Sequence, residues 1–313
     1  MRRAPPPSIQ TIAIHSPGEM GHAIGRELHK REFDVVAYLG ERSERTNRLA
    51  KSAGIRACES LESLVNQADL LLSIMVPTQA ARAAQQVATV IQRTGCNLHY
   101  VDCNAIAPHV VSAMAKQLTD AGASVTDASI IGLPPSETER PRIYTSGPDA
   151  TALSVLDGCG VDIVKLGSDV GQASAIKMCY AGLTKGRFAL YFAVLLAAQQ
   201  MNLLPQLLQE FALSQPDDHR KMRRILPKLP CKAHRWVGEM QQIAETLSDL
   251  DITKQFHVAA SEIYDLISRS TLGSESPEEI SSTRTLEETL SALQTTPRPI
   301  DRDDTDPPKD SSH

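Results

Sequence analysis

The stretch that most constrains the fold is residues 170–201, which has the spacing of one long helix and is apolar on nearly every face. Its charged residues are Lys177, Lys185 and Arg187. A helix that is hydrophobic all round is buried inside a protein, and a length of about 48 Å exceeds the width of a typical domain. We therefore expect this helix to pass between two domains, and we expect the amine of Lys177 to be paired, hydrated or functional.

Before this helix, strand-like and helical segments alternate. We expect strands at 11–15, 34–39, 70–75, 97–102, 124–128, 141–146 and 161–165, and helices at 20–32, 43–53, 78–93, 108–120 and 149–156. Such alternation is typical of a doubly wound α/β domain, in which helices cover both faces of a mostly parallel sheet. After the sheet, almost every segment has helical spacing, so the second domain is predicted to be all helical.

The chain divides into four predicted segments. A leader covers residues 1–8, the α/β domain covers 9–167, the helical domain covers 168–273, and a tail covers 274–313. The tail is rich in Ser, Thr, Pro, Asp and Glu, with one helical candidate at 286–293. Such a composition buries too little apolar surface to offset its ordering entropy, so we expect a disordered tail.

Composition narrows the class of protein. A net charge of −5 gives no reason to expect a nucleic acid partner. The longest apolar run, 188–198, is shorter than the roughly 20 residues of a membrane span, and the amino terminus lacks a secretory signal. We expect a cytoplasmic chain that binds no membrane. The six cysteines show no CxxC or Cys/His ligand spacing, so no metal site is predicted.

A short turn after the first expected strand has the pattern Ser16-x-Gly18-x-x-Gly21. In a dinucleotide-binding fingerprint the glycines allow a tight turn, a close approach to the pyrophosphate, and close packing of helix on strand. Here a serine replaces the first glycine. The turn still links a strand to a helix, whose amino terminus favours phosphate. We predict that the cofactor-binding residues include Ser16, Pro17, Gly18, Glu19, Met20 and Gly21.

The end of the second expected strand predicts the choice of cofactor. Glu41 could accept bonds from the ribose hydroxyls of NAD, whereas Arg42, Ser43 and Arg45 could hold the 2′-phosphate of NADP. The two arginines and the hydroxyl that suit NADP are more numerous than the one carboxylate that suits NAD, and this carboxylate can instead pair with Arg45 on the helix. NADP is therefore favoured over NAD.

Several motifs occur in the order found in one known family. They are PGEMG at 17–21, the Arg-Ser pair at 42–43, Val76-Pro77, VDCNAIAP at 101–108, and GQASAIKMCYAGLTKG at 171–186. Together they resemble the β-hydroxyacid dehydrogenase and 6-phosphogluconate dehydrogenase superfamily. HRWVGEMQQIAET at 234–246 and HVAASEIY at 257–264 are similar to the branch with a helical C-terminal domain like that of phosphogluconate dehydrogenase. The resemblance covers about residues 9–270.

The resemblance implies a Rossmann domain, a helical domain that helps to form a homodimer, and an active site between the two. It implies that Lys177 is the general acid/base of an oxidoreductase acting on a CH–OH group. Asn104 falls where the family contacts nicotinamide or substrate, and Val76 and Pro77 fall in its cofactor site. For Lys177, the alternative is a lysine at a helix start that reaches solvent. For Asn104, the alternative interpretation is a polar turn residue at the end of a strand, without a functional role.

Two departures from the family concern the substrate. An asparagine that helps to bind substrate follows the family's lysine by four residues, but here that position is Ala181. The family's Ser-Gly-Gly substrate anchor appears here as Ile131-Gly132-Leu133, so only Gly132 is retained. A methyl group cannot hydrogen-bond a hydroxyl or a carboxylate. We expect a substrate that is less acidic or more apolar than 3-hydroxyisobutyrate or 6-phosphogluconate.

Other side chains could take part in substrate binding. Lys185 lies on the same helix face as Lys177 and could anchor an acidic group, or could instead pair with an Asp or Glu. Trp236 and Glu239 could reach the substrate, or could belong to the core and its charged rim.

Three functional hypotheses follow. The first is an NADP-dependent oxidoreductase that transfers hydride between the cofactor and a hydroxyl or carbonyl group. The second is an NADPH-dependent imine reductase, because reductive amination needs a proton donor but no carboxylate anchor. The third is a catalytically silent NADP(H)-binding sensor or structural dimer, which the altered substrate motifs suggest and the retained Lys177 argues against.

Overall fold

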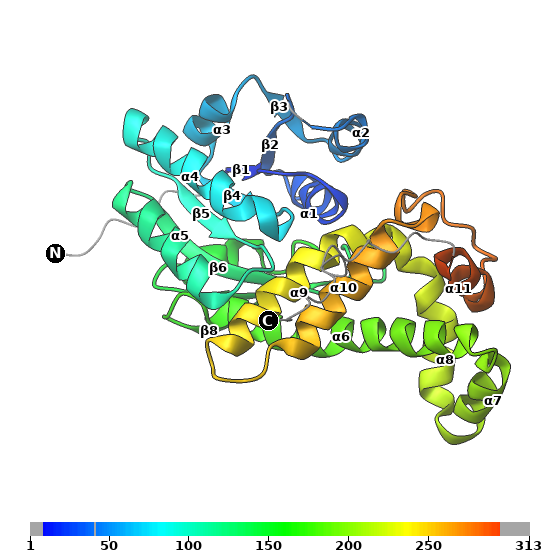
Figure 1. The fold of residues 1–313 in the computed structure, drawn as a ribbon. Coiled ribbons are helices and arrows are strands. Elements are labelled where there is room, and N and C mark those ends of the chain that lie inside the picture. Colours follow the sequence, from blue (N-terminus) through cyan, green and yellow to red (C-terminus); the bar gives the residue numbers. More distant parts are fainter. Residues whose placement is uncertain (1–8, 41, 295–313) are drawn as a thin grey trace, which may run out of the picture. The chain divides into compact units, whose positions relative to one another are not determined.

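The computed structural model describes residues 9–40 and 42–294, which form two compact units (Figure 1). Of these residues, the α/β unit contains those up to Arg187 together with 238–259, and the helical unit contains 188–237 and 260–294. Three helices contribute to both units: α6 (Gln172–Gln200), α9 (Ala233–Ser248) and α10 (Gln255–Ser268). The predicted α/β unit followed by a helical unit is confirmed. The unit boundary lies within α6, whereas the expected domain boundary was residue 167.

The α/β unit is built on an eight-stranded sheet with the order β3-β2-β1-β4-β5-β6-β7-β8. All neighbouring strands are parallel except β6 and β7. The order reverses beside β1, because β2 lies on one side of it and β4 on the other. Such a reversal leaves a crevice at the carboxyl ends of the strands, where α/β proteins bind their ligands. The strands are β1 (Thr11–Ile14), β2 (Asp34–Tyr38), β3 (Arg56–Cys58), β4 (Leu70–Ser73), β5 (His99–Asp102), β6 (Ser124–Ile131), β7 (Arg142–Ser146) and β8 (Asp162–Gly167).

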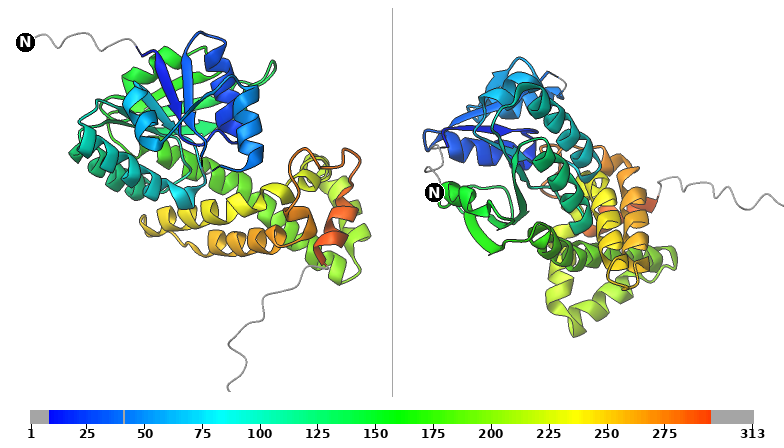
Figure 2. Two further views of the ribbon diagram at one scale, coloured as in Figure 1. Left: turned by 90° about the horizontal axis from the view of Figure 1, so that it is seen from above. Right: turned by 90° about the vertical axis from the view of Figure 1, so that its left-hand side faces the viewer.

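Helices cover both faces of this sheet (Figure 2). One core cluster joins the sheet to α3 (Leu61–Gln67), α4 (Pro77–Thr94) and α5 (Pro108–Asp120). The other joins the opposite face to α1 (Glu19–His29), α2 (Glu44–Ser52) and the 3-10 helix η1 (Ala150–Leu156). Side chains alternate between the two faces of a strand. The all-apolar β4 segment Leu70, Leu71 and Leu72 therefore supplies both clusters.

The largest differences from the sequence expectation concern three elements of the α/β unit. The strand β3 and the helix α3 were not predicted, because three residues are too few to show a period and α3 contains few apolar residues. The helix α3 is instead defined by its cap, since the Ser60 hydroxyl accepts a bond from the Ser63 N–H. The strand β6 continues to Ile131 rather than ending at residue 128, because it pairs with the antiparallel β7 along its final residues.

The long helix α6 has nearly the predicted bounds, but it is not buried on every side. Leu183, Leu190 and Val194 are exposed, with 74%, 47% and 40% of their surface accessible. By length and hydropathy α6 could cross a membrane, yet half of its most apolar window is buried within the fold. The prediction of burial all round was therefore wrong for one apolar face.

The helical unit also contains α7 (Leu204–Ser214), α8 (Pro216–Ile225), α11 (Leu286–Gln294) and three short 3-10 helices: η2 (Leu226–Lys228), η3 (Pro230–Lys232) and η4 (Thr271–Gly273). The helix α11 lies in the segment expected to be a disordered tail. It buries Leu286, Thr289, Leu290 and Leu293 and contacts α8, η2 and η4. Its periodic apolar face therefore orders this part of the segment. The leader 1–8 and the tail residues 295–313 lie outside the described residues.

Candidate functional site

The phosphate turn, residues 15–21, lies at the carboxyl end of β1, beside the reversal of strand order. The Gly18 N–H donates to the Ser16 carbonyl, 2.8 Å away, which closes a tight turn. Pro17 is buried, and Met20 packs on the core cluster that contains α1. Ser16, Gly18 and Glu19 are half-buried. The predicted turn residues thus form one compact strand-to-helix connection.

The two glycines of the turn have different surroundings. A Cβ on Gly21 would lie 2.7 Å from the Ser16 carbonyl oxygen and 3.1 Å from the Ile14 side chain. A Cβ on Gly18 would meet no protein atom within 4 Å. Gly21 is therefore required for helix α1 to pack on β1, whereas Gly18 borders open space at the helix amino terminus.

The amino terminus of α1 suits an anionic ligand. Its N-cap residue is Gly18, which has no side chain to accept bonds from the first-turn N–H groups. Val76 and Pro77 begin α4 after the adjacent strand β4, also without a capping side chain. The first-turn amides of a helix and the helix dipole attract phosphate. With the open space at Gly18, these features fit a dinucleotide pyrophosphate.

The loop after β2 brings Arg42 to the phosphate turn. Its guanidinium donates to the His15 carbonyl oxygen, 3.0 Å away. Ser43 is the N-cap of α2 and accepts the Thr46 N–H, while Arg45 lies half-buried in the first turn of that helix. Glu41, the residue that would favour NAD, lies outside the described residues. The loop therefore presents basic and hydroxyl groups next to the turn.

His15 was not identified from the sequence. Its ring is buried, and its Nδ1 atom has no hydrogen-bond partner among the described residues. Burial, and secondarily the charge of Arg42, lowers the pKa of His15 from 6.5 to about 4. The ring is therefore neutral at pH 7. Sequence position offered no signal, because His15 follows an apolar strand and its burial depends on the surrounding fold.

Asn104 ties together the carboxyl ends of β4 and β5. Its side-chain oxygen accepts the Met75 N–H at 2.7 Å, and its amide group donates to Ser73 at 3.0 Å and to Asp102 at 2.8 Å. Asn104 is buried, and these bonds use both of its amide hydrogens. It therefore shapes the strand ends, and a direct contact with a ligand stays a prediction.

Asp102, at the end of β5, is buried beneath Asn104. Burial is the main cause that raises its pKa from 3.8 to about 7, and the charge of Asp127 on β6 acts in the same direction. The two bonds from Asn104 oppose this change because they stabilise the carboxylate. The site thus contains a carboxyl group that titrates near neutral pH.

Lys177 lies near the start of α6, and its amine reaches the sheet. Its Nζ atom donates to the backbone carbonyl of Ile130, 2.7 Å away, near the carboxyl end of β6. The side chain is half-buried, so it is neither fully dry nor free in solvent. Because β1, β4, β5 and β6 run parallel, their carboxyl ends share one edge of the sheet. Lys177, Asn104 and the phosphate turn therefore lie along the same edge.

Gly132, the retained residue of the substrate motif, has a structural requirement of its own. Its φ is +135°, and a Cβ there would lie 2.9 Å from the Pro141 backbone. Such a conformation strongly favours glycine. The backbone conformation and packing alone are enough to require glycine at this position. A substrate contact at Gly132 therefore stays a prediction.

The other predicted substrate residues are engaged within the protein. Lys185 on α6 forms an ion pair with Glu239 on α9, and Glu239 is almost completely buried. Ala181 is buried one turn after Lys177. Trp236 belongs to the helical unit, where its ring packs edge-on against Tyr264 with centroids 5.1 Å apart. The alternative of a paired Lys185 thus describes this structure, and the packing of Trp236 is that of a core aromatic.

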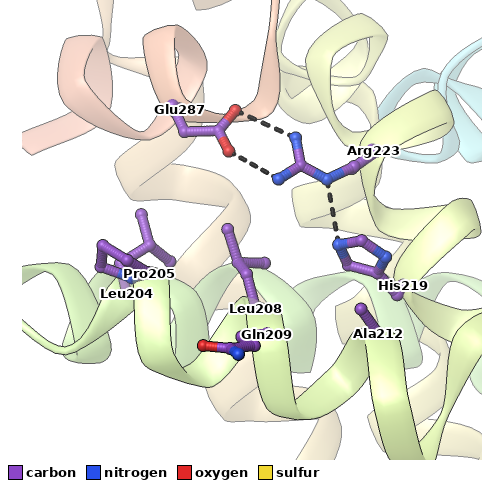
Figure 3. A pocket seen from close by; sticks show the side chains of 8 residues that line it. All are labelled: Leu204, Pro205, Leu208, Gln209, Ala212, His219, Arg223 and Glu287. Atoms are coloured by element: carbon purple, nitrogen blue, oxygen red, sulfur yellow. Dashed lines mark hydrogen bonds and ion pairs between the residues drawn. The ribbon is translucent and has the colours of Figure 1, made fainter.

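The helical unit contains a cavity of about 330 Å³ between α7, α8 and α11 (Figure 3). Leu204, Leu208 and Ala212 provide its apolar wall. Arg223 donates through both terminal nitrogens to Glu287, and through Nε to His219. These polar groups satisfy one another, and the cavity includes no residue of the phosphate turn. Among the described residues, no cluster of His, Cys, Asp or Glu could hold a metal ion.

Comparison with known families identifies the two halves of the chain. Residues 11–157 match the NAD-binding domain of 6-phosphogluconate dehydrogenase. Residues 198–267 match a domain family of unknown function, DUF1932. The sheet order, the phosphate turn and these matches define the fold of the NAD(P)-binding oxidoreductases of the hydroxyacid dehydrogenase type. More narrowly, the chain combines this NAD-binding domain with a helical DUF1932 domain, which confirms the resemblance found in its motifs.

Similar proteins support the same assignment. An uncharacterized 28.5 kDa protein of Methanothermus fervidus is 27% identical over 192 residues, which cover 61% of this chain and 72% of that protein. The solved structure of the conserved protein MTH1747, whose function is unknown, is described as similar to 3-hydroxyacid dehydrogenases. It is 26% identical, covers 82% of this chain and 96% of its own, and has a TM-score of 0.60.

Two more distant structures share the fold alone. The 3-hydroxyisobutyrate dehydrogenase of Mycobacterium tuberculosis is 13% identical and covers 91% of this chain and 99% of its own, with a TM-score of 0.62. The imine reductase of Myxococcus stipitatus in complex with NADP+ is 14% identical and covers 82% and 92%, with a TM-score of 0.51. A variant of that reductase was solved with NAD+. Proteins with this fold therefore include both a hydroxyacid dehydrogenase and imine reductases, and structures with this fold contain NAD+ or NADP+.

Proposed function

We propose that this protein is an NADP-dependent oxidoreductase that interconverts a hydroxyl and a carbonyl group on a small molecule, with Lys177 as the general acid/base. The observation that carries the proposal is the placement of the Lys177 amine. It is held by the Ile130 carbonyl at the sheet edge that also carries the phosphate turn. Ligands of doubly wound sheets bind at this edge.

Some residues of the chain bind the cofactor, and Lys177 transfers the proton. When bound, the dinucleotide supplies the hydride. The first-turn amides of α1 hold its pyrophosphate, and Arg42 and Ser43 hold its 2′-phosphate. An ammonium group has three hydrogens, and the bond to Ile130 uses one of them. Lys177 therefore retains hydrogens with which to protonate the substrate oxygen during reduction, and its neutral amine removes that proton during oxidation.

The surroundings of Lys177 favour a weakly charged, partly apolar substrate. Lys185 is neutralised by Glu239, and buried aliphatic side chains, Ala181 and Ile131, replace polar groups of the family motifs. A free carboxylate on the substrate would lack the anchors that the family uses. The same features favour imine reduction as a second candidate function, because Lys177 can donate its proton to nitrogen as well as to oxygen. The third hypothesis, a silent NADP(H) sensor, predicts cofactor binding without turnover.

The cofactor assignment is tested by replacing Arg42 with alanine. We expect the NADPH dissociation constant to rise about tenfold or more, equivalent to at least 1.4 kcal/mol, while the NADH constant changes little. The reason is that the Arg42 guanidinium can form charge-assisted bonds with the 2′-phosphate, which NADPH has and NADH lacks. Isothermal titration or fluorescence measures both constants. Arg48→Ala is the matched control, because Arg48 lies on α2, the helix that follows the Arg42 loop, and has an exposed side chain. Equal losses for both cofactors would contradict the assignment.

We also propose that the helical unit forms a homodimer through the exposed apolar face of α6. Leu190 and Val194 lie on this face, one helical turn apart, and such a patch on a soluble protein commonly marks an interface. Leu190→Glu with Val194→Glu should convert a particle of twice 34.0 kDa into one of 34.0 kDa in light scattering. Leu213→Glu, which charges an exposed position on α7, should leave the mass unchanged. A wild-type monomer would refute this proposal.

A further inference from the structure

The carboxylate of Asp127 connects β6 to the beginning of α6. Asp127 has no exposed surface. Its Oδ2 atom accepts bonds from the backbone N–H groups of Gly171 at 2.8 Å, Ala173 at 3.0 Å and Ser174 at 3.0 Å. Oδ2 also accepts the Ser146 hydroxyl at 3.0 Å, and Oδ1 accepts the Ser174 hydroxyl at 2.7 Å. One side chain thus receives five bonds: one from β7, one from Gly171 just before α6, and three from the first turn of α6.

This arrangement is a helix cap supplied by a different element. The first N–H groups of a helix have no partner within the helix, and a cap usually comes from the residue just before it. Here that position is Gly171, which has no side chain. The carboxylate from β6 takes over the role, and charge-assisted bonds of this kind are short and strong. The start of α6 is therefore fixed relative to the sheet and not merely packed against it.

Lys177 forms a second attachment between the same two elements. It follows Ser174 by three residues on α6, and its partner Ile130 follows Asp127 by three residues on β6. The cap and the lysine contact therefore run side by side along β6 and α6. If the cap were lost, the first turn of α6 could shift or fray. The amine would then lose its fixed position at the sheet edge.

We propose that Asp127 is a positioning residue for Lys177: its hydrogen bonds to the first turn of α6 hold the lysine amine in place. The proposal rests on the proposed function of Lys177, but the placement of the amine can be measured without any turnover. Nothing in the sequence pattern revealed this link, because Asp127 lies within a strand far from α6 along the chain.

Two substitutions separate hydrogen bonding from the fold. Asp127→Asn has nearly the same shape, its oxygen can accept the backbone N–H groups, and its amide can donate to the Ser174 hydroxyl, which can also accept. Asp127→Ala removes all five bonds. Asp69→Ala is the matched control. Asp69 accepts the N–H groups of Gln10 and Thr11 at 2.9 Å, at the amino end of β1, which is the opposite edge of the sheet from Ile130.

The direct measurement is the acetylation rate of Lys177 in the full-length protein without cofactor. Trace acetic anhydride at fixed pH and peptide mass spectrometry give this rate relative to Lys116, an exposed surface lysine. We expect the relative rate to rise at least fivefold in Asp127→Ala and to stay within twofold of wild type in Asp127→Asn and Asp69→Ala. An unchanged rate in folded Asp127→Ala, or equal rises in Asp127→Ala and either other variant, would overturn the proposal.

Kinetics provide a second readout once a substrate is known. Asp127→Ala should lower kcat at least 30-fold and leave the KM for NADPH within threefold, because the phosphate turn lies on other elements. Asp127→Asn should restore kcat to within fivefold of wild type. A loss that appears in the KM for NADPH instead of kcat would overturn the positioning role. If no variant, including wild type, turns over any substrate, the acetylation rates still test the placement of Lys177.

Discussion

Replacing Lys177 with methionine should lower kcat about 1,000-fold while the NADPH dissociation constant changes less than threefold. General acid/base catalysis contributes about 10²–10⁴ in rate, and a factor of 1,000 corresponds to about 4 kcal/mol of transition-state free energy. Methionine keeps the length and packing of the side chain but cannot donate to Ile130 or to a substrate. Stopped-flow or steady-state oxidation of NADPH, together with a binding titration, separates the two quantities.

The choice of control matters for this experiment. Lys185→Ala is unsuitable as a neutral control, because it would leave Glu239 buried without its partner and so destabilise the fold. Lys116→Met changes an exposed lysine that pairs with Asp120 on the surface, and it should retain wild-type kcat. Full activity in a folded Lys177→Met protein would remove Lys177 from the mechanism.

The second large effect is a contrast between the two glycines of the phosphate turn. Gly18→Ala should weaken NADPH binding at least 30-fold with little change in Tm, because the new methyl group meets no protein atom but occupies the space where the pyrophosphate approaches. Gly21→Ala should lower Tm by about 5–10 °C, because its methyl group would press on the Ser16 carbonyl, and overpacking of this kind costs roughly 1–3 kcal/mol.

Differential scanning calorimetry and NADPH titration on both variants test this contrast. The result that would contradict the account is a Gly18→Ala protein that binds NADPH like wild type. It would mean that the open space at the amino terminus of α1 is not the phosphate site. A Gly21→Ala protein of unchanged stability would show instead that the turn can relax around the extra carbon.

The sequence predicted most elements of the fold because their signals are local. Alternating apolar segments indicated the strands, and the glycine pattern placed the phosphate turn between β1 and α1. Short elements such as β3 lacked a period long enough to detect. The exposed face of α6 was missed for another reason: an apolar helix looks the same in sequence whether a given face is buried in its own core or left exposed.

The partners of site residues could not be predicted, because they depend on contacts between distant parts of the chain. Lys177 was identified from its position on an apolar helix, but its bond to Ile130 requires the packing of α6 on β6. Lys185 pairs with Glu239 on a helix that follows much later in the chain. His15 and Asp127 carry no recognisable pattern, and only burial and hydrogen bonding reveal them.

The most direct test of the proposed function is transfer of deuterium from NADPH labelled at C4 of the nicotinamide. Wild-type protein and Lys177→Met would be incubated with a panel of aldehydes, ketones and imines, and the products analysed by mass spectrometry. We predict that wild type yields a product one mass unit heavier, and that Lys177→Met yields almost none. Tight NADPH binding by wild type without labelled product from any member of the panel would contradict enzymatic reduction and favour a sensor.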